Sequence, residues 1–598
     1  MADLSTPIND GQSEQTSDNL ITQHIDIWTT AIERKSSAGR GTSKKFSLYG
    51  IKKLRELILE LAVRGKLVPQ ILSDESPSVL LDRISAEKAQ LVNEGKIKKP
   101  KVLPEISDDE KSFELPNAWN WLRLADIGYW AIGSGFPKDI QGEVDKEVLV
   151  SKVSDMNLEG NNKYIYSTNN SVDLEMAQSK KLKIHQKGTV IFPKIGGAIA
   201  TNKRRIIVKP TVIDNNCLGI TPYSIFDSEY LYLHLKSIDF VEFQAGTSVP
   251  ALSQAVLELI TLGVPPLEEQ HRIVAKVDEL MSLCDALEAQ TEASISAHQT
   301  LVETLLNALL LPNTSQAADS LSTSSNTVNA KHLNAASLEL ARGNALESSS
   351  ADSPEPSFAE SWQRVAEHFD TLFTTEASID TLKQTILQLA VMGKLVPWNE
   401  GICERELKEY LSFGPRNGFS PKEASSITNV RVLKLGATTY GDLDLNQTKY
   451  VDVNVEDNSH LWLCDGDILI QRGNSANYVG CNCLVRIDVE GVIYPDLMMK
   501  LRTVKNLNPE FLSIWLSSPK SRQFMWDRMT GTSGTMPKIS KKIVEAIPII
   551  VPSLEEQHRI VARVDELMTL CDQLKARLTD AQTTQLHLTD AIVEQAVN

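Results

Sequence analysis

Two amphipathic segments with helical spacing of their apolar residues occur twice in the chain. Nineteen of the twenty-two residues in Val264–Asp285 recur in Val551–Asp572, at a constant offset of 287 positions. Ile58–Pro69 and Ile386–Pro397 share ten of twelve residues. Near-identical frames around dissimilar sequence predict a tandem repeat with pseudo-twofold symmetry that presents two different inserts.

Apolar periodicity predicts short helices at the start of the chain and in the frames. Apolar residues recur every three or four positions in Ile21–Ile32, Leu48–Val63 and Val79–Glu94. Gly65 and Gly393 stand where the two GKLVP segments begin, each with a proline shortly beyond. We therefore expect a helix to end at each of these glycines.

The two LEEQHRIV segments predict long helices with a heptad seam. Ser553 and Glu556 predict a capping box at the start of one helix, and Pro265-Pro266 begins the other. Two homologous seams are expected to pair with each other, antiparallel if a twofold relates the halves. About 30 residues of helix span roughly 45 Å. The predicted seam residues are Ile273, Val277, Leu280, Cys284 and Leu287, then Ile560, Val564, Leu567, Cys571, Leu574, Leu578, Ala581, Leu588 and Ile592.

Between the frames the pattern changes to short apolar runs punctuated by Gly, Asn, Asp and Pro, which is typical of strands and turns. The runs include VLVSKV, GTVIFPKI and RRIIVKPTVI in the first insert, and VRVLKLG, DGDILIQRG and CLVRIDVEGVIY in the second. Both inserts also contain the tripeptide GTS, at Gly246–Ser248 and Gly531–Ser533. The chain is therefore predicted to be α+β, with two mixed α/β domains separated by long helices that form an antiparallel coiled-coil spacer.

LEEQHRIV followed by a heptad helix, and GKLVP after a helix, each occurring twice, resemble the specificity subunit of type I restriction-modification systems. The resemblance extends from about Gln23 to Asn598 and implies two target-recognition domains that alternate with repeated helical regions. The expected parts are a disordered N-terminus (1–20), a helical region (21–110), recognition domain 1 (111–264), a central coiled-coil helix (265–311), a flexible linker (312–360), a repeated helical region (361–400), recognition domain 2 (401–551) and a C-terminal coiled-coil helix (552–598).

The same resemblance implies a function and a set of partners. A member would bind a bipartite, asymmetric target in double-stranded DNA and direct adenine methylation and restriction by separate subunits. Two methyltransferase subunits would dock on the helical frames and carry S-adenosylmethionine, while restriction/translocase subunits would use ATP and Mg; this chain itself would bind no cofactor and no membrane. The frame residues expected to contact partner subunits are Glu268, Gln270, His271, Arg272, Glu555, Gln557, His558 and Arg559.

Composition fits a multidomain globular protein in a reducing compartment. A length of 598 residues predicts three or four folding units. The chain has no run of eighteen apolar residues and its N-terminus lacks the pattern of a signal peptide, so we expect a cytoplasmic protein. Its seven cysteines are scattered, and Cys481 and Cys483 lack a companion pair for zinc.

A net charge of −16 argues against a DNA-binding protein until its distribution is considered. The segment Met176–Ile213 contains nine Lys or Arg residues and no acid, and Lys520–Lys542 contains six with one acid, Asp527. Such segregation is what a nucleic-acid footprint requires. For any single basic run, a solvated face remains the alternative.

Motifs for catalysis are missing. The sequence contains no Asn/Asp-Pro-Pro-Tyr/Phe string with a glycine-rich cofactor turn, and no phosphate-binding loop. Pro495-Asp496 is not followed by the acid that a metal-dependent nuclease needs before Lys500. We therefore predict a non-catalytic chain without a metal site. The rival interpretation is a coiled-coil scaffold that makes no sequence-specific DNA contact, which would show no steep loss of DNA affinity with salt.

Base-reading residues are expected at strand ends, where short polar side chains are held firmly. Gln471–Ser475 follows the apolar strand DILI, and Lys194–Gly197, which leads to Asn202–Arg205, follows TVIF with glycines that permit close approach. An ordinary surface turn is the alternative for each. The candidate DNA-binding residues, second-rank loops included, are Gly133, Lys138, Lys180, Lys181, Lys183, Lys187, Lys194, Lys203, Arg204, Arg205, Arg416, Asn417, Lys422, Gln471, Arg472, Asn474, Ser475, Lys520, Arg522, Arg528, Lys538 and Lys541.

Overall fold

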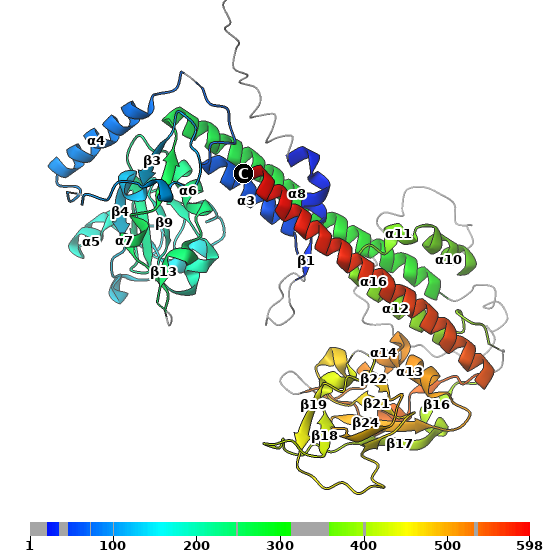
Figure 1. Cartoon of the computed structure of the whole chain (residues 1–598). Coiled ribbons are helices and arrows are strands. Elements are labelled where there is room, and N and C mark those ends of the chain that lie inside the picture. Colours follow the sequence, from blue (N-terminus) through cyan, green and yellow to red (C-terminus); the bar gives the residue numbers. More distant parts are fainter. Residues whose placement is uncertain are drawn as a thin grey trace, which may run out of the picture. The chain divides into compact units, whose positions relative to one another are not determined.

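The computed structural model of the chain divides into two compact units (Figure 1). Unit 1 comprises Met1–Ala293 and Ala581–Asn598, and unit 2 comprises Ser294–Asp580. Residues 1–20, most of the predicted linker and most of both GTS tripeptides lie outside the described part. The structure describes residues 21–34, 46–71, 73–99, 101–246, 249–311, 358–398, 402–439, 441–531 and 536–597.

The two long helices, α8 (Leu267–Leu310) and α16 (Leu554–Val597), have 44 residues each. Each is about 66 Å long at about 1.5 Å per residue, and so exceeds the predicted length. α8 begins in unit 1 and ends in unit 2, whereas α16 begins in unit 2 and ends in unit 1. The predicted capping box of α16 is confirmed, since the backbone N–H of Ser553 donates to the Glu556 carboxylate at 2.9 Å.

Each heptad seam has partners that the sequence did not predict. In unit 2 the seam of α16 belongs to a hydrophobic cluster with α12 (Glu376–Val391) and the end of α8, and no predicted seam residue of α8 is in that cluster. In unit 1, α3 (Tyr49–Val63) contacts both long helices, because Arg55 pairs with Asp285 of α8 at 2.7 Å and the Tyr49 hydroxyl donates to Asp590 of α16 at 2.7 Å. In unit 2 the seam of α16 therefore packs on α12 and the end of α8, and the prediction of two mixed α/β domains separated by long helices is confirmed.

The last turns of α16 correct a second detail of the predicted seam. Ala581 is exposed and Leu588 is 45% exposed, while Thr589 and Ile592 are buried. The buried stripe therefore departs from the predicted heptad positions where α16 leaves unit 2 and enters unit 1.

The GKLVP glycines end their helices as predicted. Gly65 and Gly393 have φ angles of +70° and +69°, which L-residues with a side chain rarely adopt. Behind each glycine the chain turns back, with the N–H of Lys66 donating to Leu61 at 3.0 Å and that of Lys394 donating to Leu389 at 3.1 Å. The remaining α-helices of the described residues are α2 (Ile25–Thr30), α4 (Pro77–Asn93), α5 (Leu174–Ser179), α6 (Ser228–Ser237), α7 (Gln254–Leu257), α10 (Phe358–Glu367), α11 (Phe369–Leu372), α13 (Pro509–Ser517), α14 (Pro519–Trp526) and α15 (Lys541–Glu545).

Domain 1 is the β-rich part of unit 1 and contains two larger sheets. Their strand orders are β4-β12-β9-β10-β6 and β7-β5-β11-β8. The pairs β10–β6 and β11–β5 are parallel and the other pairs in these sheets are antiparallel. The strands of unit 1 are β1 (Glu33–Arg34), β2 (Phe46–Ser47), β3 (Asn120–Arg123), β4 (Gly128–Ile132), β5 (Val148–Ser151), β6 (Tyr164–Ile165), β7 (Ser171–Val172), β8 (Ile184–His185), β9 (Val190–Pro193), β10 (Arg205–Ile207), β11 (Thr211–Ile213), β12 (Cys217–Pro222), β13 (Gln244–Ala245), β14 (Ala251–Leu252) and β15 (Thr261–Val264).

Domain 2, the β-rich part of unit 2, repeats most of this topology with different residues. Its sheets have the orders β17-β24-β21-β22 and β19-β18-β23-β20, and its parallel pair β18–β23 corresponds to β5–β11. The described residues of domain 2 form no counterpart of the edge strand β6. The apolar runs of both inserts form strands as predicted, and the two domains share most of one strand plan. The strands of unit 2 are β16 (Arg405–Glu406), β17 (Leu411–Asn417), β18 (Val430–Leu433), β19 (Thr448–Val451), β20 (Trp462–Leu463), β21 (Ile468–Gln471), β22 (Asn482–Leu484), β23 (Val489–Ile493), β24 (Met498–Thr503) and β25 (Pro548–Ile549).

Candidate nucleic-acid interface

The predicted base reader Gln471 lies inside domain 2. It is the last residue of β21, which runs between β24 and β22 and is buried along its length. The amide nitrogen donates to the Leu435 carbonyl at 2.9 Å and to the Thr438 hydroxyl at 3.1 Å, and the amide oxygen accepts from Asn474 at 2.7 Å. The structure thus gives Gln471 an internal role in place of the base-reading role that its position after a strand suggested.

The residues that follow Gln471 reach the surface beside a distant segment. Gly473 forms an isolated β-bridge with Lys538, and the Arg472 carbonyl accepts from the N–H of Ile539 at 2.9 Å. Arg472 is half-buried, and Ser475 and Lys538 are exposed. Two of the predicted basic positions, 66 residues apart in sequence, are therefore brought together at one edge of the domain.

Three consecutive basic residues of domain 1, Lys203–Arg205, make contacts within the domain. Arg204 is fully buried, with its guanidinium 3.9 Å from the ring centroid of Phe240. It donates to the carbonyls of Leu235 and Ile238 at the end of α6, at 2.9 and 3.4 Å. Burial lowers the pKa of Arg204 to about 9, and the helix carbonyls favour a cation at this end. Arg204 therefore caps a helix and does not face DNA, contrary to the prediction.

The neighbours of Arg204 also make internal contacts. Arg205 donates to the carbonyls of Met156, at 2.7 Å, and Asn161, and Lys203 donates to the side chain of Asn157. These bonds attach the loop that precedes β6 to the residues at the start of β10. A basic run can thus serve the packing of a domain as well as its surface.

Other lysines of the first insert do reach the surface. Lys138, Lys181, Lys183, Lys187 and Lys209 are exposed and Lys194 is half-buried. Lys180 is instead paired with Asp139 at 2.6 Å. At Gly133 a Cβ atom would lie 1.9 Å from the carbonyl oxygen of Asp214, so this glycine serves a close approach of two backbones.

Domain 2 carries an open hollow that the sequence did not reveal. Its volume is about 870 Å³, and its lining includes the aromatic residues Phe413, Phe419 and Trp462 together with Arg416 and His460. Arg416 is exposed at the end of β17. Aromatic faces and an arginine are groups that contact bases and phosphates, whereas Glu456 and Asp457 at the same hollow would repel a phosphate.

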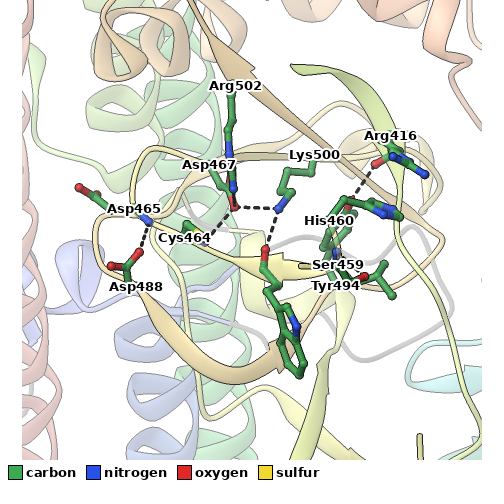
Figure 2. Close-up of polar contacts among 12 residues, drawn as sticks. Arg416, Ser459, His460, Cys464, Asp465, Asp467, Asp488, Tyr494, Lys500 and Arg502 are labelled. Atoms are coloured by element: carbon green, nitrogen blue, oxygen red, sulfur yellow. Dashed lines mark hydrogen bonds and ion pairs between the residues drawn. The ribbon is translucent and has the colours of Figure 1, made fainter. Parts of the chain in front are cut away.

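A buried ion pair supports the floor of this hollow (Figure 2). Lys500 of β24 and Asp467 are almost fully buried and lie 3.0 Å apart. The Lys500 ammonium also donates to the Trp462 carbonyl at 2.7 Å, and Asp467 further contacts Arg502 and accepts from the N–H of Cys464 at 2.9 Å. Both charges are therefore compensated, and the turn before β21 is tied to β24.

The charges around His460 show where the cations of domain 2 gather. The pKa of His460 is lowered by burial, then by Arg416, and also by Lys500 and Lys541. Arg416 and Lys541 come from β17 and α15, so the fold brings together two predicted sites that lie far apart in sequence. At neutral pH the imidazole is neutral, with its Nε2 3.5 Å from the Asn417 carbonyl. The aromatic and histidine content of Asp452–Trp462 was the available sequence signal for this site.

The remaining predicted cations of domain 2 divide into two groups. Lys422 is exposed. Lys520 pairs with Glu404 at 2.6 Å, Arg522 donates to the Asn477 carbonyl at 2.8 Å, and Arg528 stacks over Phe524 at 3.8 Å. The second group is therefore engaged in local contacts at the surface.

Among the frame residues predicted to contact partner subunits, some are exposed and others are buried or paired within the chain. Glu268, His271, Glu555, His558 and Arg559 are exposed. Arg272 pairs with Asp74 at 2.6 Å. Gln270 and Gln557 are fully buried and make hydrogen bonds within their own units, so these two are not available to a partner as predicted.

The described residues contain no cluster of three or more His, Cys, Asp or Glu side chains that is suited to hold a metal ion. In the same ranges, no helix is both long enough and apolar enough to span a membrane.

The sequence and the structure were compared with those of known proteins. The family model for the type I restriction modification DNA specificity domain matches residues 142–297 and 404–581. The chain is 32% identical to the type I restriction enzyme EcoEI specificity subunit and 33% identical to the EcoAI specificity subunit, both from Escherichia coli, over 97% of this chain and 100% of each relative. A solved HsdS subunit from Thermoanaerobacter tengcongensis is 18% identical with a TM-score of 0.37, over 82% of this chain and 98% of that one.

Proposed function

The chain belongs to the family of type I restriction modification DNA specificity proteins, and on this premise we propose that it recognises a bipartite, asymmetric sequence in double-stranded DNA. One observation carries the proposal. Two domains share most of a strand topology while their surface residues differ, and each is attached to one of two long helices that differ at only two of their first 19 residues. In this proposal each domain reads one half of the target and the helices set the distance between the halves.

The chemistry belongs to other subunits in this proposal. Two methyltransferase subunits would supply S-adenosylmethionine and modify an adenine in each half, and restriction subunits would add ATP- and Mg-dependent cleavage. The specificity subunits of the family are in general non-catalytic, and the missing methyltransferase and nucleotide-binding motifs support the same for this chain. Exposed frame residues such as His271, His558 and Arg559 are the proposed docking contacts.

The DNA contacts are proposed on the side chains that the fold leaves accessible. In domain 2 these are Arg416 at the hollow and Lys541, whose charge acts on His460 there, with Arg472 and Lys538 at the end of β21. Arginine suits a guanine edge in the major groove, whereas lysine serves mainly as a phosphate contact. In domain 1 the proposed contacts are the exposed lysines Lys138, Lys181, Lys183, Lys187 and Lys209.

The first experiment measures DNA affinity against salt for the chain assembled with its methyltransferase subunits, on a duplex whose target is identified by sequencing methylated adenines. Replacing both Arg416 and Lys541 with Ala should lower the slope of log affinity against log salt by about 0.9 for each phosphate that the variant no longer binds. Lys505→Ala is the matched control, an exposed lysine that is not among the charges acting on His460. Unchanged affinity and slope in the double variant would remove the hollow from the interface.

A second experiment tests the division between readers and spacer. Exchanging residues 401–551 for the corresponding segment of a relative should change the methylated bases of one half-site only. Four residues inserted after Thr291 add about 6 Å to α8 and should lengthen the gap without changing either half. Altered bases at constant gap in the insertion variant would contradict the proposal. A scaffold that does not read DNA would give no sequence-specific methylation in any variant.

A further inference from the structure

One glutamine at the start of each long helix makes the same hydrogen bonds in both units. The side-chain oxygen of Gln270 accepts from the backbone N–H of Asp227 at 2.8 Å, and that of Gln557 accepts from the N–H of Asn508 at 2.7 Å. Both glutamines are fully buried. The residues they hold belong to the inserts, which differ in sequence, and yet the bond is the same.

The amide nitrogens complete the arrangement. Gln270 Nε2 donates to the Pro265 carbonyl at 3.0 Å, and Gln557 Nε2 donates to the Pro552 carbonyl at 2.8 Å and to the Asn506 carbonyl at 3.0 Å. Only an amide offers an acceptor and two donors on one short side chain. A carboxylate at this position would face carbonyl oxygens, and an apolar side chain would leave buried backbone groups unsatisfied.

The bonded residues are themselves helix caps. The Asp227 side chain accepts from the N–H groups of Glu229 and Tyr230 at 2.7 and 2.9 Å and so begins α6. The Asn508 side chain accepts from Glu510 and Phe511 at 2.7 and 3.2 Å and begins α13. In each unit a continuous set of hydrogen bonds therefore runs from the long helix, through the glutamine and the cap, into the helix that lies against the sheet of its domain.

Charged residues surround the same junction. In unit 1, Lys163 lies 2.6 Å from Glu229 of α6 and 2.9 Å from Asp278 of α8, so one cation joins domain and helix. In unit 2, Arg486 contacts Glu510 of α13, and Asp565 of α16 occupies the position that corresponds to Asp278. Both junctions therefore hold the same three kinds of charged group, and in unit 1 a cation pairs with the acids of both helices.

We infer that Gln270 and Gln557 are positioning residues that fix each recognition domain on its long helix, and thereby restrict the complex to one gap length between half-sites. The inference rests on the proposed function. Two linked readers bind together only when their geometry permits both to engage. A domain that tilts at its junction would accept other gaps at the expense of the native one, while its own base contacts would persist.

The test uses Gln557→Met in the full chain, assembled with its methyltransferase subunits, because methionine keeps the length of the side chain and removes its hydrogen bonds. Loss of a buried hydrogen bond of about 1 kcal/mol corresponds to roughly a fivefold loss of affinity for the native target. The expected result is that loss together with methylation at gaps one base pair longer or shorter, with unchanged bases in both halves. Gln573→Met, at an exposed glutamine of the same helix, should behave as the wild type.

The outcomes separate this inference from the proposed function. If the wild-type complex methylates no bipartite sequence, the proposed function fails. If it does, and Gln557→Met keeps a single gap at the wild-type rate, only the positioning role fails. Amide hydrogen exchange should be faster at 508–512 in the variant and unchanged in β21. A general loss of protection would mean that the methionine variant is unfolded, and Gln557→Glu, which keeps the bond to Asn508, would then replace it. A widened range of gaps in that variant would support the positioning role, and a single gap would contradict it.

Discussion

Domains 1 and 2 share most of their strand topology but accommodate a buried cation in different ways. In domain 1 the guanidinium of Arg204 lies against Phe240 and donates to backbone carbonyls at the end of α6. In domain 2 the ammonium of Lys500 is paired with the buried carboxylate of Asp467. The fold therefore fixes where the strands run, whereas the means of neutralising an interior charge belongs to each sequence.

The largest expected change in stability comes from breaking the ion pair between Lys500 and Asp467 in domain 2. Asp467→Asn leaves Lys500 buried without a carboxylate and should destabilise unit 2 by about 3–5 kcal/mol in denaturant unfolding. Asp465→Asn, at an exposed neighbour whose side chain does not bond to Lys500, should change stability by less than about 0.5 kcal/mol. Equal stability of the two variants would show that the ion pair does not compensate the buried charge.

A smaller loss of stability is expected when Arg204, the buried cation of domain 1, is replaced. Arg204→Met removes the hydrogen bonds to the carbonyls of α6 and the contact with the aromatic ring, and should cost about 2–3 kcal/mol of unfolding free energy. Lys187→Met, at an exposed lysine, should leave stability unchanged and affect only DNA affinity. If Arg204→Met kept wild-type stability and lost DNA affinity, the interpretation of the basic run as a DNA contact would be restored.

The junction acids should respond in opposite directions to one substitution. Asp278→Asn removes a partner of Lys163 and should destabilise unit 1 by up to about 1 kcal/mol. Asp565→Asn should stabilise unit 2 by a few tenths of a kcal/mol, since burial and the nearby Glu510 raise the pKa of Asp565 and water screens the exposed carboxylate. Thermal shifts of the same sign in both variants would contradict this difference.

The pH dependence of the two junctions gives the smallest effect. Burial alone would raise the pKa of Glu229, but bonds from Lys163 and Tyr164 hold it below its ordinary 4.5. Its contribution to stability is therefore present above pH 4.5 and is lost as the pH falls through the lowered pKa. Asp565 has the opposite sign, because its raised pKa favours the protonated form below 3.8, and that contribution is lost as the pH rises through the raised value. Denaturation of Glu229→Gln and Asp565→Asn between pH 3 and 7 should show slopes that differ from wild type in opposite directions.

Much of the fold followed from the sequence because local pattern determines it. The apolar stripe of α3, the glycines that end two helices and the capping box at Ser553 depend on residues a few positions apart. The elements that cover the heptad seams could not be predicted from the sequence, because a heptad pattern indicates which face of a helix is buried and not what covers it. α16 changes partners along its length, and its buried stripe changes with them.

The candidate site was less predictable for a related reason. A basic run indicates charge but not accessibility, and Arg204 and Lys187 look alike in sequence although one is buried and the other exposed. Gln471 follows an apolar strand as a surface residue would, yet hydrogen-bond partners about 35 residues earlier hold it inside. The gathering of Arg416 and Lys541 beside His460 depends on long-range strand order, which no short motif encodes.

The division of each long helix between the units bears on the order in which the protein is completed during synthesis. Unit 1 contains the N-terminal domain and also Ala581–Asn598, and Lys66 donates to the carbonyl of Val597 at 2.8 Å. At roughly 5–20 residues per second, the ribosome needs a further quarter of a minute to a minute after Ala293 before that last segment exists. The domain that is translated first therefore belongs to a unit that is completed only after domain 2 has been made, and a nascent chain must keep α3 and α8 soluble without this partner until Ala581–Val597 has been translated.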